Sequence, residues 1–388
     1  MASVLALFHR STLNPRLELF AQALVDDGHN VEALCWRRGG ASNAEGDVVP
    51  TTRINTPNFP MSLWNVFFIP ILYCKFVVAI YRRQPDVLLC GHISLLPLAV
   101  LLGLLTRTPV VYDVVETYET GYRSRDSVLA GPFTTLVTGI ERLCLRGVAG
   151  ITVIDTAEGL LAERYRGFTD NMDVVYNLPR VKPAPEQEGT DGPTTIVYAG
   201  LVDERKGVPT LLEAFSDIHP DHNIELLVVG GAVDDTLERL QERASELGVS
   251  DDVEFVGQVP YDEVHDHLLR GDIAVAPYQR LEVYEISRWN TRKIPDYMNA
   301  GLPVVAPNFG GFPEIIEETG CGITVDTGDV EAVADGIESL LADPDRAREL
   351  GQHGRRALEE QYNWEREQTK VLNLVGKALR EKRVIKER

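Results

Sequence analysis

Two blocks of alternating strand-like and helix-like segments, separated by a stretch with almost nothing to bury, constrain the fold of this chain most strongly. The separating stretch at 181–193, VKPAPEQEGTDGP, is rich in proline, glycine and acid, which is typical of a linker. The chain has 388 residues, enough for two ordinary domains. Because short apolar strands that alternate with helices form parallel sheets, the pattern predicts two doubly wound α/β domains.

The apolar runs follow one another as a doubly wound sheet requires. Residues 14–27 have helical periodicity and lie between strand-like runs at 3–8 and 31–35, which predicts a βαβ unit. Further strands of the first block are expected at 86–90, 109–115, 151–154 and 173–179. The second block predicts strands at 195–200, 225–231, 253–257, 272–277, 303–307 and 322–326, and helices at 208–218, 234–247 and 291–300.

The acidic charge of the chain belongs to its second block. The net charge is −20; residues 181–369 hold 39 acids and 15 bases, whereas residues 1–180 hold 17 acids and 16 bases. We expect no nucleic-acid partner, because binding to phosphates needs a basic face. The five cysteines lack metal or disulfide spacing, and the apolar start lacks the basic residues of a signal peptide, which favours a cytoplasmic protein.

Two apolar stretches in the first block allow three interpretations. Residues 63–81 are about as long as a membrane span, but Pro70 and Lys75 interrupt them, and residues 95–105 are too short to cross. They predict buried helices on the sheet, a transmembrane helix, or a helix lying at the membrane interface. The balanced first block and the basic end at 377–388 are compatible with peripheral contact at the inner, cytoplasmic face of a membrane.

One segment of the second block, NTRKIPDYMNAGLPVVAPNFGGFPE, carries a nucleotide-site pattern. Lys293 and Asp296 are three residues apart and share one helix face, and a turn at Gly310 and Gly311 leads to Glu314 and another helix. Carboxylates accept hydrogen bonds from ribose hydroxyls, and glycine turns at helix starts present N–H groups to phosphate. The alternative is a surface ion pair followed by an ordinary loop.

A second pattern, YAGLVDERKGVPTLLEAF, places cations after a strand. Arg205 and Lys206 follow the expected strand at 195–200 and precede a helix. Cations at the carboxyl end of a strand in an open α/β sheet can neutralise a diphosphate. The alternative for these two residues is a solvated basic loop.

With these motifs the chain resembles the retaining glycosyltransferases of the GT-B fold, glycosyltransferase family 4. The resemblance rests on the two patterns above and on VEFVGQVPYDEV, DIAVAPY and the closing YNWERE. It implies two Rossmann-like domains facing a cleft. The acceptor-side domain would comprise 1–180 and 367–388, the linker 181–193, and the nucleotide-sugar domain 194–366.

The resemblance also implies roles for individual residues. Lys206 matches a lysine that meets the donor phosphates, and Asp296 matches an acid that binds ribose. Gly257 and Gln258 fall where backbone groups hold the base. Other donor-binding candidates are Arg205, Lys293, Gly310, Gly311 and Glu314, and the catalytic candidates are Glu116, His92 and Lys206.

Three positions depart from the family pattern. Leu201 stands where an arginine usually follows the glycine, Arg288 stands where a glutamate usually contacts the transferred sugar, and Val115 stands at a usual histidine. Arg205 is a candidate to replace the arginine that is missing at position 201. Asp113 and Glu116 lie beside Val115 and are candidates to line the cleft.

The function expected from the resemblance is hexosyl transfer with retention, from a UDP- or GDP-sugar to a lipid-linked or glycan acceptor. No cofactor and no metal are expected. Two alternatives stay open: a catalytically inactive protein that binds sugar nucleotides or glycans, and a nucleotide-sugar 2-epimerase of the same fold.

Overall fold

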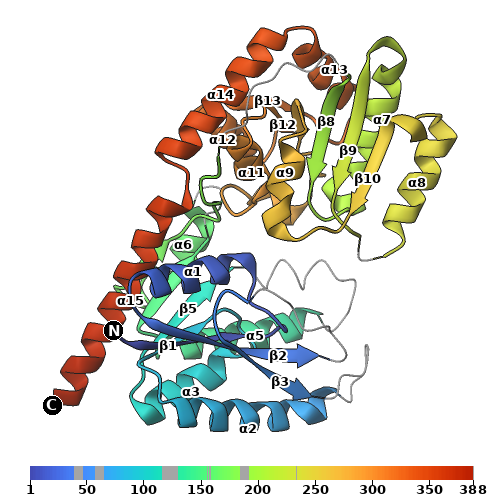
Figure 1. The fold of residues 1–388 in the computed structure, drawn as a ribbon. Coiled ribbons are helices and arrows are strands. Elements are labelled where there is room, and N and C mark those ends of the chain that lie inside the picture. The colour runs from blue at the N-terminus through green and yellow to red at the C-terminus, as the bar shows by residue number, and fades with distance from the viewer. Residues whose placement is uncertain are drawn as a thin grey trace. The chain divides into compact units, whose positions relative to one another are not determined.

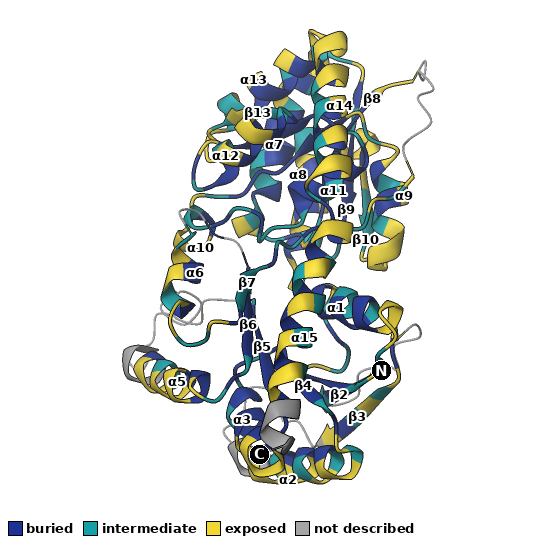
Figure 2. Ribbon diagram, turned by 90° about the vertical axis from the view of Figure 1, so that its left-hand side faces the viewer, coloured by how far each residue is buried: buried dark blue, intermediate teal, exposed yellow. Residues whose placement is uncertain are grey.

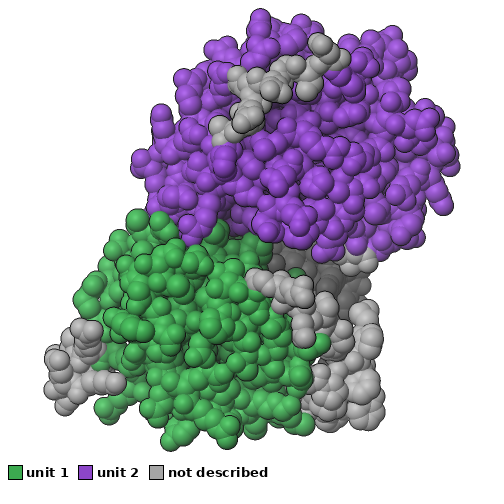
Figure 3. Space-filling view, viewed as in Figure 1, with its two compact units in different colours: residues 1–155, 161–176, 367–388 green, residues 156–160, 177–366 purple. Residues whose placement is uncertain are grey.

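The computed structural model shows two α/β units, each built on a parallel sheet (Figure 1). It describes residues 1–38, 47–56, 65–115, 130–154, 156, 159–183, 192–232 and 234–387. Unit 1 comprises 1–155, 161–176 and 367–388, and unit 2 comprises 156–160 and 177–366 (Figure 3). The predicted fold class, two doubly wound domains with parallel sheets, is confirmed.

The sheet of unit 1 has seven parallel strands in the order β3-β2-β1-β4-β5-β6-β7. The strands are β1 (Ser3–Phe8), β2 (Asn30–Arg38), β3 (Thr51–Thr56), β4 (Val87–Cys90), β5 (Val110–Val114), β6 (Gly150–Val153) and β7 (Met172–Val174). The central strands are buried on both faces, which explains why they read as continuous apolar runs. The strand β3 was not predicted, because its residues TTRINT at the sheet edge are mostly polar.

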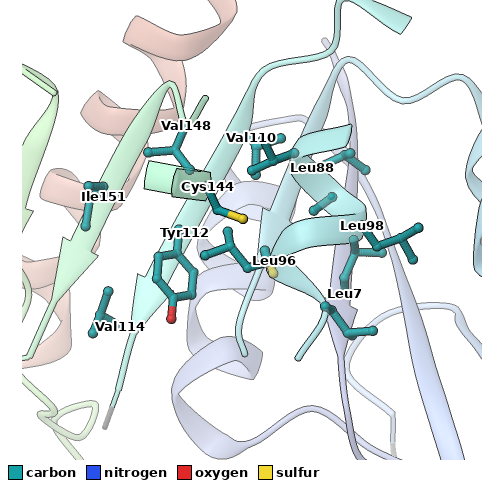
Figure 4. Packing of buried hydrophobic residues seen from close by; sticks show 14 of the residues in the cluster. Leu7, Leu88, Leu96, Leu98, Val110, Tyr112, Val114, Cys144, Val148 and Ile151 are labelled. Atoms are coloured by element: carbon teal, nitrogen blue, oxygen red, sulfur yellow. The ribbon is translucent and has the colours of Figure 1, made fainter. Parts of the chain in front are cut away.

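Helices cover both faces of this sheet. They are α1 (Pro15–Asp26), α2 (Asn65–Arg83), α3 (Leu96–Thr106), α5 (Ala130–Leu145), α6 (Leu160–Tyr165) and the later residues of α15 (Trp364–Glu387). Four of them, α2, α3, α5 and α6, share one hydrophobic core with the sheet. In Figure 4, Leu96 and Leu98 of α3 and Cys144 of α5 point toward sheet residues such as Val110 and Tyr112.

The two apolar stretches form α2 and α3, and both pack on the sheet. Leu72, Phe76 and Ile80 of α2 are almost completely buried, as the buried-helix interpretation predicts. Within the described ranges, no helix combines the length and the hydropathy that a membrane crossing requires.

The basic end of the chain is partly structural. In α15, Val371 and Leu374 are buried, and Lys382 is only 7% exposed. The Nζ atom of Lys382 donates to the carbonyl of Pro85 at 3.1 Å and to Oδ1 of Asp86 at 2.9 Å. This lysine therefore anchors α15 to the start of β4 rather than lying in solvent.

Unit 2 is built on six parallel strands in the order β10-β9-β8-β11-β12-β13. The strands are β8 (Thr194–Ala199), β9 (Ile224–Val229), β10 (Val253–Gly257), β11 (Ile273–Val275), β12 (Val304–Pro307) and β13 (Gly322–Val325). The helices are α7 (Val208–Ile218), α8 (Thr236–Leu247), α9 (Val264–Leu268), α10 (Glu282–Glu285), α11 (Lys293–Asn299), α12 (Phe312–Thr319), α13 (Val330–Leu341) and α14 (Pro344–Glu360). Every strand expected in the second block is present, with ends that differ by one or two residues.

Candidate functional site: the carboxyl ends of β8 and β11

The strand order of unit 2 selects one place for a ligand. The chain order of the strands reverses between the neighbours β8 and β11, so the connections that follow these two strands depart in opposite directions. In open α/β sheets, ligands bind in the crevice outside the carboxyl ends of the strands at such a switch point. The loops after Ala199 and after Val275 therefore delimit the candidate site.

Lys206 lies at this switch point, in the loop after β8. It ends a short 3-10 helix, Glu204–Lys206, which the Asp203 side chain caps through the backbone N–H of Arg205. The Nζ atom of Lys206 lies 4.8 Å from the ring centre of Tyr278 and 4.6 Å from that of Tyr284. Burial lowers the pKa of Lys206 to about 8. Among the described residues no carboxylate forms an ion pair with it, so its charge is available to an anion.

A tight turn places Lys206 against the loop after β11. Gly207 has a φ of +75°, and a Cβ atom there would lie 1.6 Å from the carbonyl oxygen of Pro277. Only glycine combines that conformation with so close an approach. The sequence Lys206-Gly207 is therefore required for the lysine to reach the aromatic rings.

A second lysine lies at the end of β8. Lys293, on α11, is 7% exposed. Its Nζ atom donates to the carbonyl of Ala199 at 2.6 Å and lies 3.9 Å from the ring centre of Tyr198. Burial and the nearby charge of Lys206 lower the pKa of Lys293 well below its ordinary value. A Cβ atom on Gly200 would lie 1.9 Å from this ammonium, so the glycine makes room for it.

Asp296 lies one turn further along α11 and faces a tyrosine and an arginine. The hydroxyl of Tyr261 donates to Oδ1 of Asp296 at 2.7 Å, and the guanidinium of Arg292 stacks 4.2 Å over the Tyr261 ring and donates to its hydroxyl. Burial raises the pKa of Asp296, while Arg292 opposes that shift. No described residue donates to Oδ2 of Asp296, which leaves an acceptor for a ligand hydroxyl.

The expected glycine turn precedes α12 and packs on the loop that contains α10. Gly310 has a φ of +61°, and a Cβ atom there would lie 2.7 Å from the carbonyl oxygen of Tyr284. A Cβ atom on Gly311 would lie 2.7 Å from the carbonyl oxygen of Ser287. The turn and the Lys206 loop thus meet the same aromatic residue, Tyr284.

Glu314 and Arg288 are joined beside this turn. Glu314, exposed in the first turn of α12, forms an ion pair with Nε of Arg288 at 2.8 Å, and Glu318 pairs with the same guanidinium. Arg288, the departure from the family pattern, therefore carries two carboxylate partners in this structure.

The remaining donor-binding candidates lie in neighbouring loops. Gly257 ends β10 with a φ of +80°, and its carbonyl accepts from the N–H of Gly230 at 2.9 Å. Gln258 packs on Gly231, where a Cβ atom would lie 2.9 Å from the Cβ of Gln258. Arg205 is exposed and forms a two-pronged hydrogen bond with Asp203.

The two catalytic candidates of the first block belong to unit 1. His92 follows β4 and lies at that sheet's own switch point, between β1 and β4. Its ring stacks on the ring of His9 with centroids 3.5 Å apart, and its Nδ1 atom lies 2.8 Å from the Ser94 hydroxyl. Glu116 lies outside the described residues.

Asp113, a candidate to line the cleft, lies within β5 and is buried. Arg16 of α1 donates to both of its carboxylate oxygens, at 3.1 Å each from Nε, and Thr152 donates to Oδ1 at 2.7 Å. A second nitrogen of Arg16 donates to the carbonyl of Val175 at 2.9 Å. Asp113 therefore joins α1 to the sheet and has no carboxylate oxygen free for a substrate.

The tyrosines that surround the two lysines were not predicted from the sequence. Tyr198, Tyr278 and Tyr284 lie in different loops or strands, and no sequence periodicity links them. Tyr198 opens the pattern YAGLVDERKGVPTLLEAF and Tyr278 directly follows the strand-like run 272–277, but neither position indicated a contact with a lysine. Among the described residues, no three histidine, cysteine, aspartate or glutamate side chains cluster closely enough to hold a metal ion.

The class of the protein follows from its family models, which describe glycosyltransferase domains and match one α/β unit each. The model of the Glycosyl transferase 4-like domain matches residues 11–177, and the model of Glycosyl transferases group 1 matches residues 182–357. The chain belongs to this family of glycosyltransferases, glycosyltransferase family 4 with the GT-B fold.

Curated relatives match the chain over about half of its length. A GDP-mannose-dependent alpha-(1-6)-phosphatidylinositol monomannoside mannosyltransferase of Mycobacterium tuberculosis is 34% identical over 174 residues, 45% of this chain and 44% of that protein. Spore coat protein SA of Bacillus subtilis is 28% identical over 257 residues, 61% of this chain and 67% of that protein. The chain thus spans less than half the length of the first of these relatives.

Solved structures match nearly the whole chain and show the fold. Sucrose-phosphate synthase from Thermosynechococcus elongatus superposes with a TM-score of 0.71 at 20% identity, over 96% of this chain and 98% of that chain. Anabaena HepE in complex with UDP and glucose superposes with a TM-score of 0.72 at 16% identity, over 97% and 100%.

Proposed function

We propose that the chain transfers a hexose, with retention of configuration, from a nucleoside diphosphate sugar to a lipid-linked or glycan acceptor. The observation that carries the proposal is the Lys206 ammonium, half-buried at the switch point of unit 2 without a carboxylate partner among the described residues. A dianionic diphosphate is the ligand that such a site favours. The names of the relatives, one dependent on GDP-mannose and one solved with UDP and glucose, support a GDP- or UDP-sugar.

Each candidate residue of unit 2 has a role in this proposal. Lys206 neutralises the diphosphate, Lys293 donates a hydrogen bond beside it, and Asp296 accepts hydrogen bonds from ribose hydroxyls through its open Oδ2 atom. Gly257 and Gln258 hold the base through backbone groups. Arg205, the turn at Gly310 and Gly311, and Glu314 surround the phosphates and the sugar.

The proposed chemistry is front-face substitution at the anomeric carbon. The bond from that carbon to the diphosphate oxygen breaks, the bond to the acceptor oxygen forms on the same face, and the acceptor proton passes to the departing diphosphate. The protein contributes charge stabilisation of the leaving group and placement of the acceptor. Lys206 stabilises the leaving group, and His92 and Glu116 are the proposed acceptor-side residues. No cofactor takes part in the proposed reaction.

Transfer of labelled sugar tests the proposal. The purified chain is incubated with GDP-mannose, UDP-glucose or UDP-galactose labelled in the sugar, together with a lipid extract as acceptor. We expect label in the lipid fraction with one donor, an equal amount of released nucleoside diphosphate, and the α-anomer in the product by NMR. Release of free UDP from a UDP-N-acetyl sugar without acceptor, with the sugar recovered as its 2-epimer, would instead identify a 2-epimerase.

A second candidate, a sugar-nucleotide-binding protein without transferase activity, is favoured by Arg288. The family glutamate at this position contacts the transferred sugar, whereas Arg288 is held by Glu314 and Glu318. In the same assay this candidate predicts saturable donor binding with no label in any acceptor.

Replacing Asp296 with alanine should weaken donor binding with little change in turnover. Loss of a charge-assisted hydrogen bond of about 1.5–3 kcal/mol corresponds to an increase in the donor KM of about 10–100-fold. The kcat should stay within about threefold, because the ribose is bound equally in the ground and transition states. Asp266→Ala, an exposed carboxylate of α9, is the matched control and should leave KM unchanged. An unchanged donor KM in Asp296→Ala would remove Asp296 from the site.

Donor affinity should fall as the pH rises through 8. Burial lowers the pKa of Lys206 to about 8, and only its protonated form attracts the diphosphate. Binding of a dianion raises this pKa, so the dissociation constant should be flat below pH 8 and increase up to about tenfold per pH unit above it. Isothermal titration calorimetry with the nucleoside diphosphate from pH 6.5 to 9.5 measures this slope. If the same pH dependence of the dissociation constant persists in Lys206→Gln, another titrating group causes it.

A further inference from the structure

Helices α3 and α5 of unit 1 expose an unusual number of large apolar side chains. Their inner faces pack on the sheet, as Figure 4 shows for Leu96, Leu98 and Cys144. Their outer faces bear leucine and isoleucine side chains that are 40–72% exposed, and the exposed faces appear as yellow segments of both helices in Figure 2. These six residues, which we call the leucine face, are Leu101, Leu104 and Leu105 of α3 and Leu136, Ile140 and Leu143 of α5.

The leucine face is one surface rather than two separate stripes. Helices α3 and α5 pack against each other. On α3 the exposed residues have helical spacings of three and four, and on α5 they recur after four and then three residues, so each set lies along one side of its helix. An apolar patch of this kind, uncovered and rimmed by polar residues, marks an interaction site.

The charges around the leucine face identify the partner. Arg107, Arg142 and Arg146 are exposed beside it, and within the described part of the chain none of them forms an ion pair. Helix α3 contains no acidic residue, and the only acid of α5, Glu141, is buried and bonded to Tyr112 and Tyr165. The chain as a whole carries a net charge of −20, so this is a locally basic surface on a strongly acidic protein.

We infer that the leucine face docks on an anionic lipid bilayer, with the leucines in the acyl boundary and the three arginines among the headgroups. An apolar face flanked by basic side chains is the feature of a helix that lies in the membrane interface. With 11 residues, α3 is too short to cross a bilayer. A second copy of the chain is a poorer occupant, because a two-fold contact would bring the same arginines together.

This inference does not depend on the proposed transferase activity, and its test uses neither donor nor acceptor. The full chain is sedimented in 0.1 M salt with vesicles of phosphatidylcholine containing one quarter phosphatidylglycerol, and with pure phosphatidylcholine vesicles. We expect binding to the anionic vesicles, at least tenfold stronger than to the neutral ones. Absence of binding to the anionic vesicles would overturn the inference and leave the donor site of unit 2 unaffected.

Two sets of variants separate the apolar and ionic contributions. The triple variant Leu104→Gln, Leu105→Gln, Leu143→Gln should reduce vesicle binding at least tenfold without lowering the melting temperature, because these side chains are exposed. Replacing Arg107, Arg142 and Arg146 with glutamine should cost about fivefold in binding per residue and abolish the preference for anionic lipid. Val25→Gln, an exposed apolar residue of α1 that is 39% accessible, is the matched control and should bind like the wild type.

Light scattering of the same proteins excludes the alternative occupant. We expect the wild type and the leucine variant to have the same mass in solution. A wild-type dimer that the leucine variant converts to a monomer would assign the leucine face to contact between copies and overturn the inference. Unchanged vesicle binding in the leucine variant would overturn it as well.

Discussion

Replacing Lys206 with alanine should lower kcat/KM for the nucleotide-sugar donor by about 10²–10³-fold, the range measured when one charge-stabilising group is removed from a transition state. The ammonium is held by the Gly207 turn against two tyrosine rings, whereas the Nζ atom of Lys293 is already bonded to the carbonyl of Ala199. Both kcat and donor affinity should fall, because the diphosphate gains charge as the sugar departs. Initial rates of label transfer at varied donor concentration measure both quantities.

The matched control for this experiment is Arg243→Ala. Arg243 is an exposed cation of α8 in the same unit and pairs with Glu213 and Glu246, so its loss changes the net charge equally. We expect its kcat/KM to stay within twofold of the wild type. Equal losses of kcat/KM in the two variants would show that the effect of Lys206→Ala comes only from the change in net charge. Full activity of Lys206→Ala would contradict the assignment of Lys206 to the donor site.

Replacing Arg16 with leucine should destabilise the protein by about 3–5 kcal/mol, the usual cost of leaving one partner of a buried ion pair uncompensated. The side chains of Arg16 and Asp113 are 4% and 0% exposed. Without the guanidinium, the Asp113 carboxylate keeps only the hydroxyl of Thr152, and the carbonyl of Val175 loses its donor. Urea denaturation followed by circular dichroism measures the change in the free energy of unfolding.

Two further variants show whether the buried pair is the cause. Arg83→Leu removes an ion pair with Glu32 in which both side chains are more than a quarter exposed, and it should cost less than about 1 kcal/mol. The double variant Arg16→Leu, Asp113→Leu removes both buried charges and should recover at least about 2 kcal/mol of the loss. If Arg16→Leu unfolds at the same urea concentration as the wild type, the pair does not join α1 to the sheet as described.

Most strands could be predicted because the central strands of both sheets are buried on both faces and therefore appear as short continuous apolar runs. β1, β8 and β12 were all expected within a residue of their ends. The edge strand β3 escaped because one polar-rich strand at the border of a sheet has no distinctive pattern. The predicted and observed helix ends in the second block differ by one or two residues. At α8, for example, the turn at Asp234-Asp235 precedes the first helical residue.

The candidate site was partly predictable for a different reason. Each of the two main site residues stands in a local motif. Lys206 follows a strand and precedes a glycine, and Asp296 is an acid on one helix face, so a single segment identifies each of them. The partners of these residues come from elsewhere in the chain: Tyr284 reaches Lys206, and Tyr261 reaches Asp296 across 35 residues. Only the packed sheet brings such pairs together, and the same holds for Arg16 and Asp113, which are 97 residues apart.

The proposed donor diphosphate binds at the switch point of unit 2, and a crystal structure of the chain with its preferred nucleoside diphosphate tests this placement. We expect a phosphate oxygen about 2.7–3.2 Å from Nζ of Lys206 and a ribose hydroxyl at the same distance from the carboxylate of Asp296. A nucleotide bound elsewhere, for example beside His92 at the switch point of unit 1, with Lys206 still packed on its two tyrosines and free of ligand, would contradict it.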